Sequence, residues 1–232
     1  TAELSYLQDR KVAYENLAKR TGLEGVKSVC LALMQSERYG TPLGTSLRVM
    51  AQENRDMRMM EAEKKAAGLP PKLTAATGMD ALTHNVESYL SPEYHPLCDG
   101  IALEGVRIAA RALPIAFRDG HNLQARSDML MSSMMGAIAF QKDLGAVHSC
   151  AHALSTVADL HHGLANGIMI DHVMRFNLTA ATAKMAELAR VAGVPGAESL
   201  SERDAAAAFI DWLARMKADL GIPATLSALV VK

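Results

Sequence analysis

The sequence predicts an all-α fold, in which a helical metal-binding domain follows a small helical domain or extension. Ala, Leu and Met are abundant, whereas aromatic residues make up only 4% of the 232 residues, and this composition favours helices over a β-rich fold. Apolar residues also recur at helical spacing, and residues 1–70 contain no strand-like run. These observations exclude an α/β fold for the first third of the chain.

The net charge and the number of cysteines limit the class to which the protein can belong. The net charge is −1 and half of the residues are apolar, so nothing indicates binding to nucleic acid or to an anionic membrane. The three cysteines, Cys30, Cys98 and Cys150, are odd in number and far apart, as is typical of a reducing compartment. With neither a signal peptide nor an apolar run of transmembrane length, we expect a cytoplasmic protein with no transmembrane segment.

The first part of the chain is expected to form helices alone. The expected elements, in order, are a helix over 4–18, a turn at Thr21–Gly22, an apolar helix over 26–35, a break at 39–42 and a helix over 43–67 whose later, charged part is a solvated face. All eight histidines lie between His84 and His172. The absence of histidine from the first part of the chain, together with the helix-breaking Gly68 and Pro70–Pro71, predicts two domains, 1–68 and 69–232.

Helices are also expected throughout the second part. They cover, in order, 73–90, 99–113, 124–140, 148–157, 162–177, 180–193 and 202–220, with loops at 91–96 and 118–122 and a turn at 221–223. The helix over 124–140 is rich in methionine, which we interpret as core filler. Its small residues predict close contact with neighbouring helices.

Two histidine-containing pairs at helical spacing predict a metal site. Asp80 and His84 stand four residues apart, as do His148 and His152, and His162 follows ten residues after His152. Residues four apart share one helix face. One carboxylate with three or four imidazoles suits a divalent ion such as Fe(II) or Zn(II). A single such histidine is more often a core or surface residue, so the combination carries the hypothesis.

These residues lie in two stretches that resemble a known family. Residues 70–87 (PPKLTAATGMDALTHNVE) and 145–177, which include HGLANG at 162–167, resemble the two signatures of the iron-containing alcohol dehydrogenases. The resemblance runs from about Leu69 to the C-terminus. It implies oxidation of a small alcohol or reduction of an aldehyde by a metal-dependent enzyme that uses NAD(P), and it leaves a homo-oligomer open.

The resemblance also implies a role for each site residue. Asp80, His84, His148 and His162 correspond to the family's four metal ligands. His152 corresponds to a residue beside the reacting centre that relays a proton, and it is the expected catalytic residue. Phe140 could line the substrate pocket.

The chain departs from this family in its first part. The family binds NAD(P) with an N-terminal α/β domain and a glycine-rich phosphate loop, but this chain has no Gly-Gly pair and no β-α pattern before Asp80. We therefore expect weak or absent activity for the chain alone, with NAD(P) bound only if a partner supplies the nucleotide-binding half. The family usually continues for a few more helices, so the C-terminus also looks clipped.

A second resemblance covers residues 1–73. Residues 26–73, including ALMQSERYGTPLG at 32–44 and AEKKAA at 62–67, are similar to the cytoplasmic helical domain of the type II secretion F and tight-adherence pilus platform family. The two resemblances meet on Leu-Pro-Pro-Lys-Leu at 69–73, which suggests a chimeric chain. The alternative function is therefore a helical interaction or platform fragment of a secretion or pilus assembly system.

Overall fold

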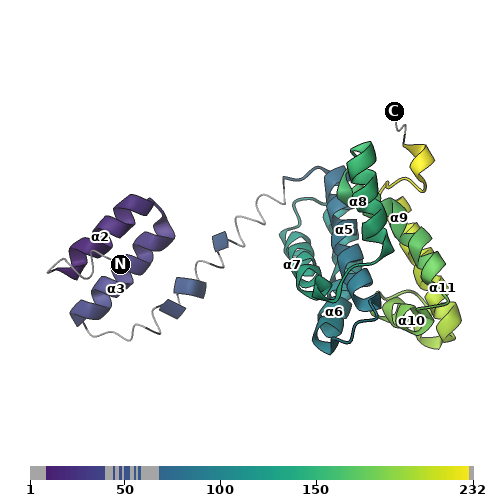
Figure 1. Ribbon diagram of the computed structural model, residues 1–232, viewed down its shortest axis with the longest axis horizontal. Coiled ribbons are helices and arrows are strands. Elements are labelled where there is room, and N and C mark those ends of the chain that lie inside the picture. Colours follow the sequence, from purple (N-terminus) through teal and green to yellow (C-terminus); the bar gives the residue numbers. More distant parts are fainter. Residues whose placement is uncertain are drawn as a thin grey trace. The chain divides into compact units, whose positions relative to one another are not determined.

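The computed structural model describes residues 9–39, 44, 47, 48, 50–52, 55, 57, 58 and 68–229. Every regular element in these residues is a helix, so the all-α prediction is confirmed (Figure 1). The chain divides into two compact units, Thr1–Ala62 and Glu63–Lys232. Residues 59–67 lie outside the described ones, so the domain boundary expected at residue 68 stays a prediction.

The first unit contains a pair of packed helices, α2 (Arg10–Thr21) and α3 (Glu24–Tyr39). Asp9 accepts a hydrogen bond from the Lys11 N–H at the start of α2, and Gly22 ends the helix in the left-handed conformation with φ 64°. The turn expected at residues 21 and 22 is therefore found. Most of the helix expected over 43–67 lies outside the described residues.

Helices of the second unit run one after another with short connections (Figure 1). They are α5 (Pro71–Leu90), α6 (Pro96–Arg118), α7 (Leu123–Ala139), α8 (Ala146–Ala158), α9 (His162–Asn177), α10 (Thr182–Val191) and α11 (Glu202–Asp219), with 3₁₀ turns η1 (Phe140–Lys142), η2 (Ala197–Ser199) and η3 (Leu226–Ala228). Most of these bounds lie within two residues of the expected ones, because most breaks carry Gly, Pro, Asn or Asp. The exception is α6, expected over 99–113, which begins at Pro96 and continues past Pro114 to Arg118.

Helix α5 lies at the centre of this unit and packs against α6, α7 and α9. It begins at Pro71, where a proline is well tolerated because the first N–H groups of a helix have no partner within it. Its buried residues surround the whole helix, as expected of a helix that is covered on all sides. The core that it organises includes Met79, Leu82, Val86, Leu113, Ile168, Met174, Leu188, Phe209 and Leu213.

Helix α7 corrects the interpretation of its methionines as core filler in part: Met129 packs against the core, but Met134 does not. Met134 is 47% exposed and Ile138 is 40% exposed. The side of α7 that is buried carries small residues instead, namely Ser132, Gly136 and Ala139. A Cβ on Gly136 would lie 2.8 Å from the Cβ of His84, so only small residues allow α7 this close to α5 at this point, and Met134 lies on the other side.

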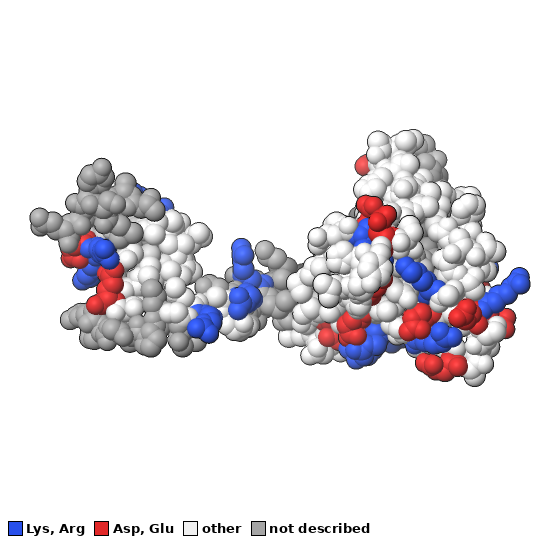
Figure 2. Space-filling view, turned by 60° about the horizontal axis from the view of Figure 1, so that its bottom comes forward, with Lys and Arg blue, Asp and Glu red and all other residues white. Residues whose placement is uncertain are grey.

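Positive and negative side chains are interspersed on the face of the second unit that Figure 2 shows. A field of one sign, such as nucleic acid would attract, does not extend over that face. Among the described helices, none is long and apolar enough to cross a membrane.

Candidate metal centre

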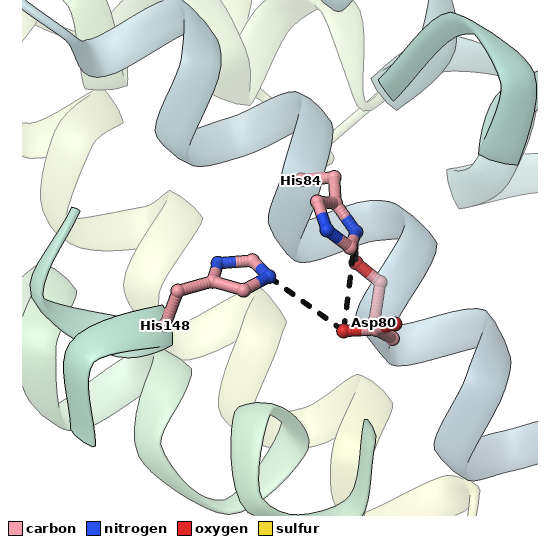
Figure 3. A group of neighbouring side chains, drawn as sticks. All are labelled: Asp80, His84 and His148. Atoms are coloured by element: carbon pink, nitrogen blue, oxygen red, sulfur yellow. Dashed lines mark hydrogen bonds and ion pairs between the residues drawn. The ribbon is translucent and has the colours of Figure 1, made fainter. Parts of the chain in front are cut away.

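Three side chains from α5 and α8 converge on one point (Figure 3). Asp80 and His84 extend from successive turns of α5, and His148 approaches from the first turn of α8. The Oδ1 atom of Asp80 lies 3.7 Å from Nε2 of His148 and 3.9 Å from Nδ1 of His84. One potential ligand atom from each residue lies within 4.8 Å of the other two. This spacing is what a single ion needs to contact all three.

His162 reaches the same carboxylate from the first residue of α9. Its Nε2 atom lies 3.5 Å from Oδ1 of Asp80. Asn166, one turn further along α9, donates from Nδ2 to the same Oδ1 over 2.6 Å and lies 3.1 Å from Nε2 of His162. The structure therefore brings the three expected histidine ligands around the fourth, Asp80. It adds the buried amide of Asn166, which donates a hydrogen bond to the Asp80 carboxylate.

His152 lies next to this group on the solvent side. Its ring centroid is 4.9 Å from that of His162 and 6.4 Å from that of His148. The side chain is exposed. It is therefore placed to exchange protons with solvent while remaining beside the cluster.

The charges of the cluster shift the pKa values of its members. Burial alone lowers the pKa of His148, but the carboxylates of Asp80 and Glu87 outweigh burial and raise it from 6.5 to about 9. Burial lowers the pKa of His84 and of His162, against the opposing effect of Asp80. Burial raises the pKa of Asp80, but the imidazoles and Asn166 bring it below its ordinary value.

One orphaned atom tests whether these residues fit a metal ion. Nε2 of His148 is buried and has no hydrogen-bond partner, and a buried polar atom without a partner is costly. The other ring nitrogen, Nδ1, lies 2.7 Å from the carboxylate of Glu87 and so carries a proton, which leaves the Nε2 lone pair free once the ring is neutral. Nδ1 of His84 likewise donates a hydrogen bond, here to the backbone carbonyl oxygen of Asp80 over 2.9 Å. The donor set of one carboxylate and imidazole nitrogens therefore fits a divalent ion.

Three other residues, Phe140, His161 and Cys150, lie at or near the site. Phe140 presents its ring to His84, with 5.6 Å between centroids, and is 41% exposed. His161 is exposed and accepts the Leu164 N–H as the N-cap of α9. Cys150 is a free thiol of intermediate exposure. His161 therefore positions the helix that carries His162.

Glu87 and Asn166 are two further residues of the site, and sequence reasoning gave neither a role. Glu87 stands three residues after His84, and Asn166 stands four after His162, so each shares a helix face with a histidine of the cluster. That spacing was a signal that could have found both. Their partners could not be foreseen, because His148 lies 61 residues from Glu87 and Asp80 lies 86 residues from Asn166.

Comparison with known proteins gives the family. Residues 74–232 match the model of the C-terminal part of the Fe-containing alcohol dehydrogenase family. The chain is 45% identical over 166 residues to 1,3-propanediol dehydrogenase of Citrobacter freundii, covering 71% of this chain and 43% of that protein. It is 42% identical over 144 residues to 4-hydroxybutyrate dehydrogenase of Cupriavidus necator, covering 58% of this chain and 38% of that protein.

Solved structures agree with the sequence matches. The crystal structure of a 1,3-propanediol oxidoreductase superposes with a TM-score of 0.68 at 44% identity, over 72% of this chain and 44% of that chain. An alcohol dehydrogenase from Oenococcus oeni superposes with a TM-score of 0.69 at 36% identity, over 72% and 43%. The chain spans less than half the length of these relatives.

The matches support the first of the two resemblances found in the sequence. They give no support to a secretion or pilus relationship for residues 1–73, nor to a chimera. The match to the C-terminal model covers more than half of the residues and includes the whole histidine cluster. The chain therefore belongs to the Fe-containing alcohol dehydrogenase family.

Proposed function

We propose that the second unit holds one divalent metal ion through Asp80, His84, His148 and His162, and thereby activates a small alcohol or aldehyde for oxidoreduction. The observation that carries this proposal is the buried Nε2 of His148, which has no hydrogen-bond partner and lies 3.7 Å from the Asp80 carboxylate. A lone pair held in this position, beside an anion, suits a cation.

The ligand set favours Fe(II), with Zn(II) as the alternative. Imidazole nitrogen and carboxylate oxygen suit both ions, and the family's description favours iron. The depressed pKa values of His84 and His162 keep these rings neutral near pH 7 and ready to coordinate. The raised pKa of His148 means that a metal ion must displace a proton there.

When bound, such an ion would polarise the alcohol oxygen and lower its pKa. The residues around the site supply the remaining functions. His152 is exposed and stands beside His162, so its imidazole can accept a proton from the substrate side and pass it to solvent. Phe140 offers an apolar ring next to His84, which would keep water from one side of the substrate.

Hydride transfer requires NAD(P), and we assign its binding to a nucleotide-binding half that a partner supplies to this unit. Relatives named for 1,3-propanediol and for 4-hydroxybutyrate support a short hydroxylated substrate. The free thiols of Cys30, Cys98 and Cys150 are consistent with a reducing cytoplasm.

Elemental analysis and an activity assay test this proposal together. Purified protein loaded anaerobically with Fe(II) or Zn(II) should retain about one ion per chain. NADH formation with propanol or 1,3-propanediol should appear when the nucleotide-binding half of a related enzyme is added. Protein that retains no ion after dialysis would contradict the proposal. No described contact favours the alternative of a secretion platform fragment.

A further inference from the structure

Helix α8 lacks the cap that its N-terminus needs. Its N-cap residue, Gly145, has no side chain to accept a hydrogen bond, and its first turn has no acidic residue. The first N–H groups of a helix have no partner within the helix, and the helix dipole makes this end partly positive. A carboxylate from elsewhere in the fold would therefore stabilise it.

Glu87 supplies that carboxylate from α5. Its Oε1 atom accepts the Val147 N–H over 2.8 Å, and its Oε2 atom accepts the His148 N–H over 3.2 Å. The same Oε2 accepts Nδ1–H of the His148 ring over 2.7 Å. The side chains of His148 and Glu87 are only 3% and 2% exposed. One carboxylate therefore fixes both the start of α8 and the ring that this turn carries.

The fit around Glu87 leaves no room for a larger residue at the helix start. A Cβ on Gly145 would lie 2.5 Å from Oε1 of Glu87, which is closer than real Cβ atoms approach any neighbour. The position that lacks a capping side chain is thus the position where the Glu87 carboxylate enters.

We infer that Glu87 is a positioning residue for the metal centre: it holds the proton of His148 on Nδ1 and aims the Nε2 lone pair of that ring at Asp80. This inference rests on the proposed metal-binding function. Carboxylates that hold the second ring nitrogen of a ligand histidine set its tautomer and orientation, and their loss typically weakens metal binding 10- to 100-fold.

Glutamine at this position would not be a conservative change. The three donors that meet Glu87 require acceptors, but a glutamine presents one oxygen and one NH₂ group. With the NH₂ toward His148, the neutral ring would accept at Nδ1 and carry its proton on Nε2, which blocks coordination. With the NH₂ toward Val147, the cap of α8 would be lost.

The test compares Glu87→Gln with a matched loss of another buried carboxylate, Asp171→Asn. Asp171 is 6% exposed and pairs with Lys217, away from the cluster. We expect Glu87→Gln to weaken zinc binding about 10- to 100-fold in competition titrations. Asp171→Asn should lower the thermal midpoint but keep wild-type zinc affinity. Equal affinity losses in both variants, or none in Glu87→Gln, would overturn the inference.

A spectroscopic readout separates positioning from general destabilisation. In ¹⁵N-labelled, zinc-loaded wild type, the His148 ring should show its proton on Nδ1, in slow exchange because it is bonded to Glu87. This resonance should disappear in Glu87→Ala, where no side-chain acceptor remains for it, and its persistence there in slow exchange would overturn the inference. If Glu87→Gln does not fold, Gly145→Ala displaces the same carboxylate and should also weaken zinc binding. Wild-type affinity in Gly145→Ala with its helicity retained would count against the inference.

Failure of the proposed function can be told apart from failure of this inference. Wild type that binds no zinc would refute the metal site. The Nδ1–H resonance of His148 can still be measured in the metal-free protein, where its presence in wild type and its absence in Glu87→Ala would support the role of Glu87 in holding the ring.

Discussion

Replacing Gly163 by alanine should displace His162 from the site, because this glycine lies where α9 crosses α5. An added Cβ would lie 2.4 Å from the carbonyl oxygen of Ala76 and 3.2 Å from Cβ of Asp80. Ordinary contact begins at 3.4 Å, so the start of α9 must move by about 3.4 − 2.4 = 1.0 Å. The two nearest obstructing atoms belong to the backbone of Ala76 in α5, which cannot rotate away as a side chain would.

A shift of that size exceeds what a metal site tolerates. Ligand distances in such sites hold to about 0.2 Å, and His162 precedes Gly163 directly, so its ring moves with the helix. We expect metal affinity to fall by about 10-fold or more. Overpacking lowers the free energy of unfolding by about 1–3 kcal/mol. The higher helix propensity of alanine raises it by about 0.5–1 kcal/mol. The thermal midpoint should therefore fall by several degrees.

The matched control is Gly100→Ala in α6, where an added Cβ meets nothing within 4 Å. This variant should keep its metal affinity and gain up to about 1 kcal/mol of stability. Thermal unfolding by circular dichroism and zinc competition titrations measure both effects. Gly163→Ala with wild-type affinity and an unchanged midpoint would refute the reasoning that this crossing positions His162.

Further predictions concern the ligands, pH and activity. His84→Ala and His148→Ala should each lose most bound metal in elemental analysis, whereas His152→Ala should keep it; equal loss in His152→Ala would show that this residue is a ligand. In the folded, metal-free protein the pKa of His148 is raised from 6.5 to about 9. The charged ring therefore stabilises the metal-free fold fully below pH 6.5, and this stability should be lost as pH rises through about 9. A thermal midpoint that stays constant over this range, or that falls equally in His148→Ala, would argue against this prediction. Metal affinity should rise with pH over the same range, because each bound ion displaces the His148 proton. Isothermal titration calorimetry at several pH values measures this affinity. A constant affinity from pH 5 to pH 8 would contradict a site with three histidine ligands. The chain alone, fully metallated, should form little NADH from propanol, because hydride transfer needs a nicotinamide held within about 3–3.5 Å of the carbinol carbon; robust turnover without an added nucleotide-binding half would overturn this expectation.

Much of the fold could be predicted because local signals agreed with it. Apolar periodicity and Gly, Pro and Asn breaks gave the helices of the second unit, and the i, i+4 spacing placed Asp80 and His84 on one face of α5. These relations act within a few residues, so one helix suffices to derive them. Their agreement with the tertiary structure is typical of sequences in which local and global preferences coincide.

Contacts between distant segments could not be predicted in the same way. The bond from Glu87 to His148 depends on where the first turn of α8 meets α5, and periodicity says nothing of how helices pack. The outward placement of Met134 has the same cause, because the close approach at Gly136 selects the small side of α7. Asp171 and Lys217 are of types that are mostly exposed unless paired, and here they form a buried pair.

The central claim is that one metal ion is held by Asp80, His84, His148 and His162 without His152. An anomalous difference map from crystals of the metal-loaded protein, collected at the metal absorption edge, tests it most directly. We expect one peak at a distance of about 2.0–2.2 Å from one atom of each of these four side chains. A peak coordinated by His152 or by the sulfur of Cys150, or no peak in this cluster, would contradict it.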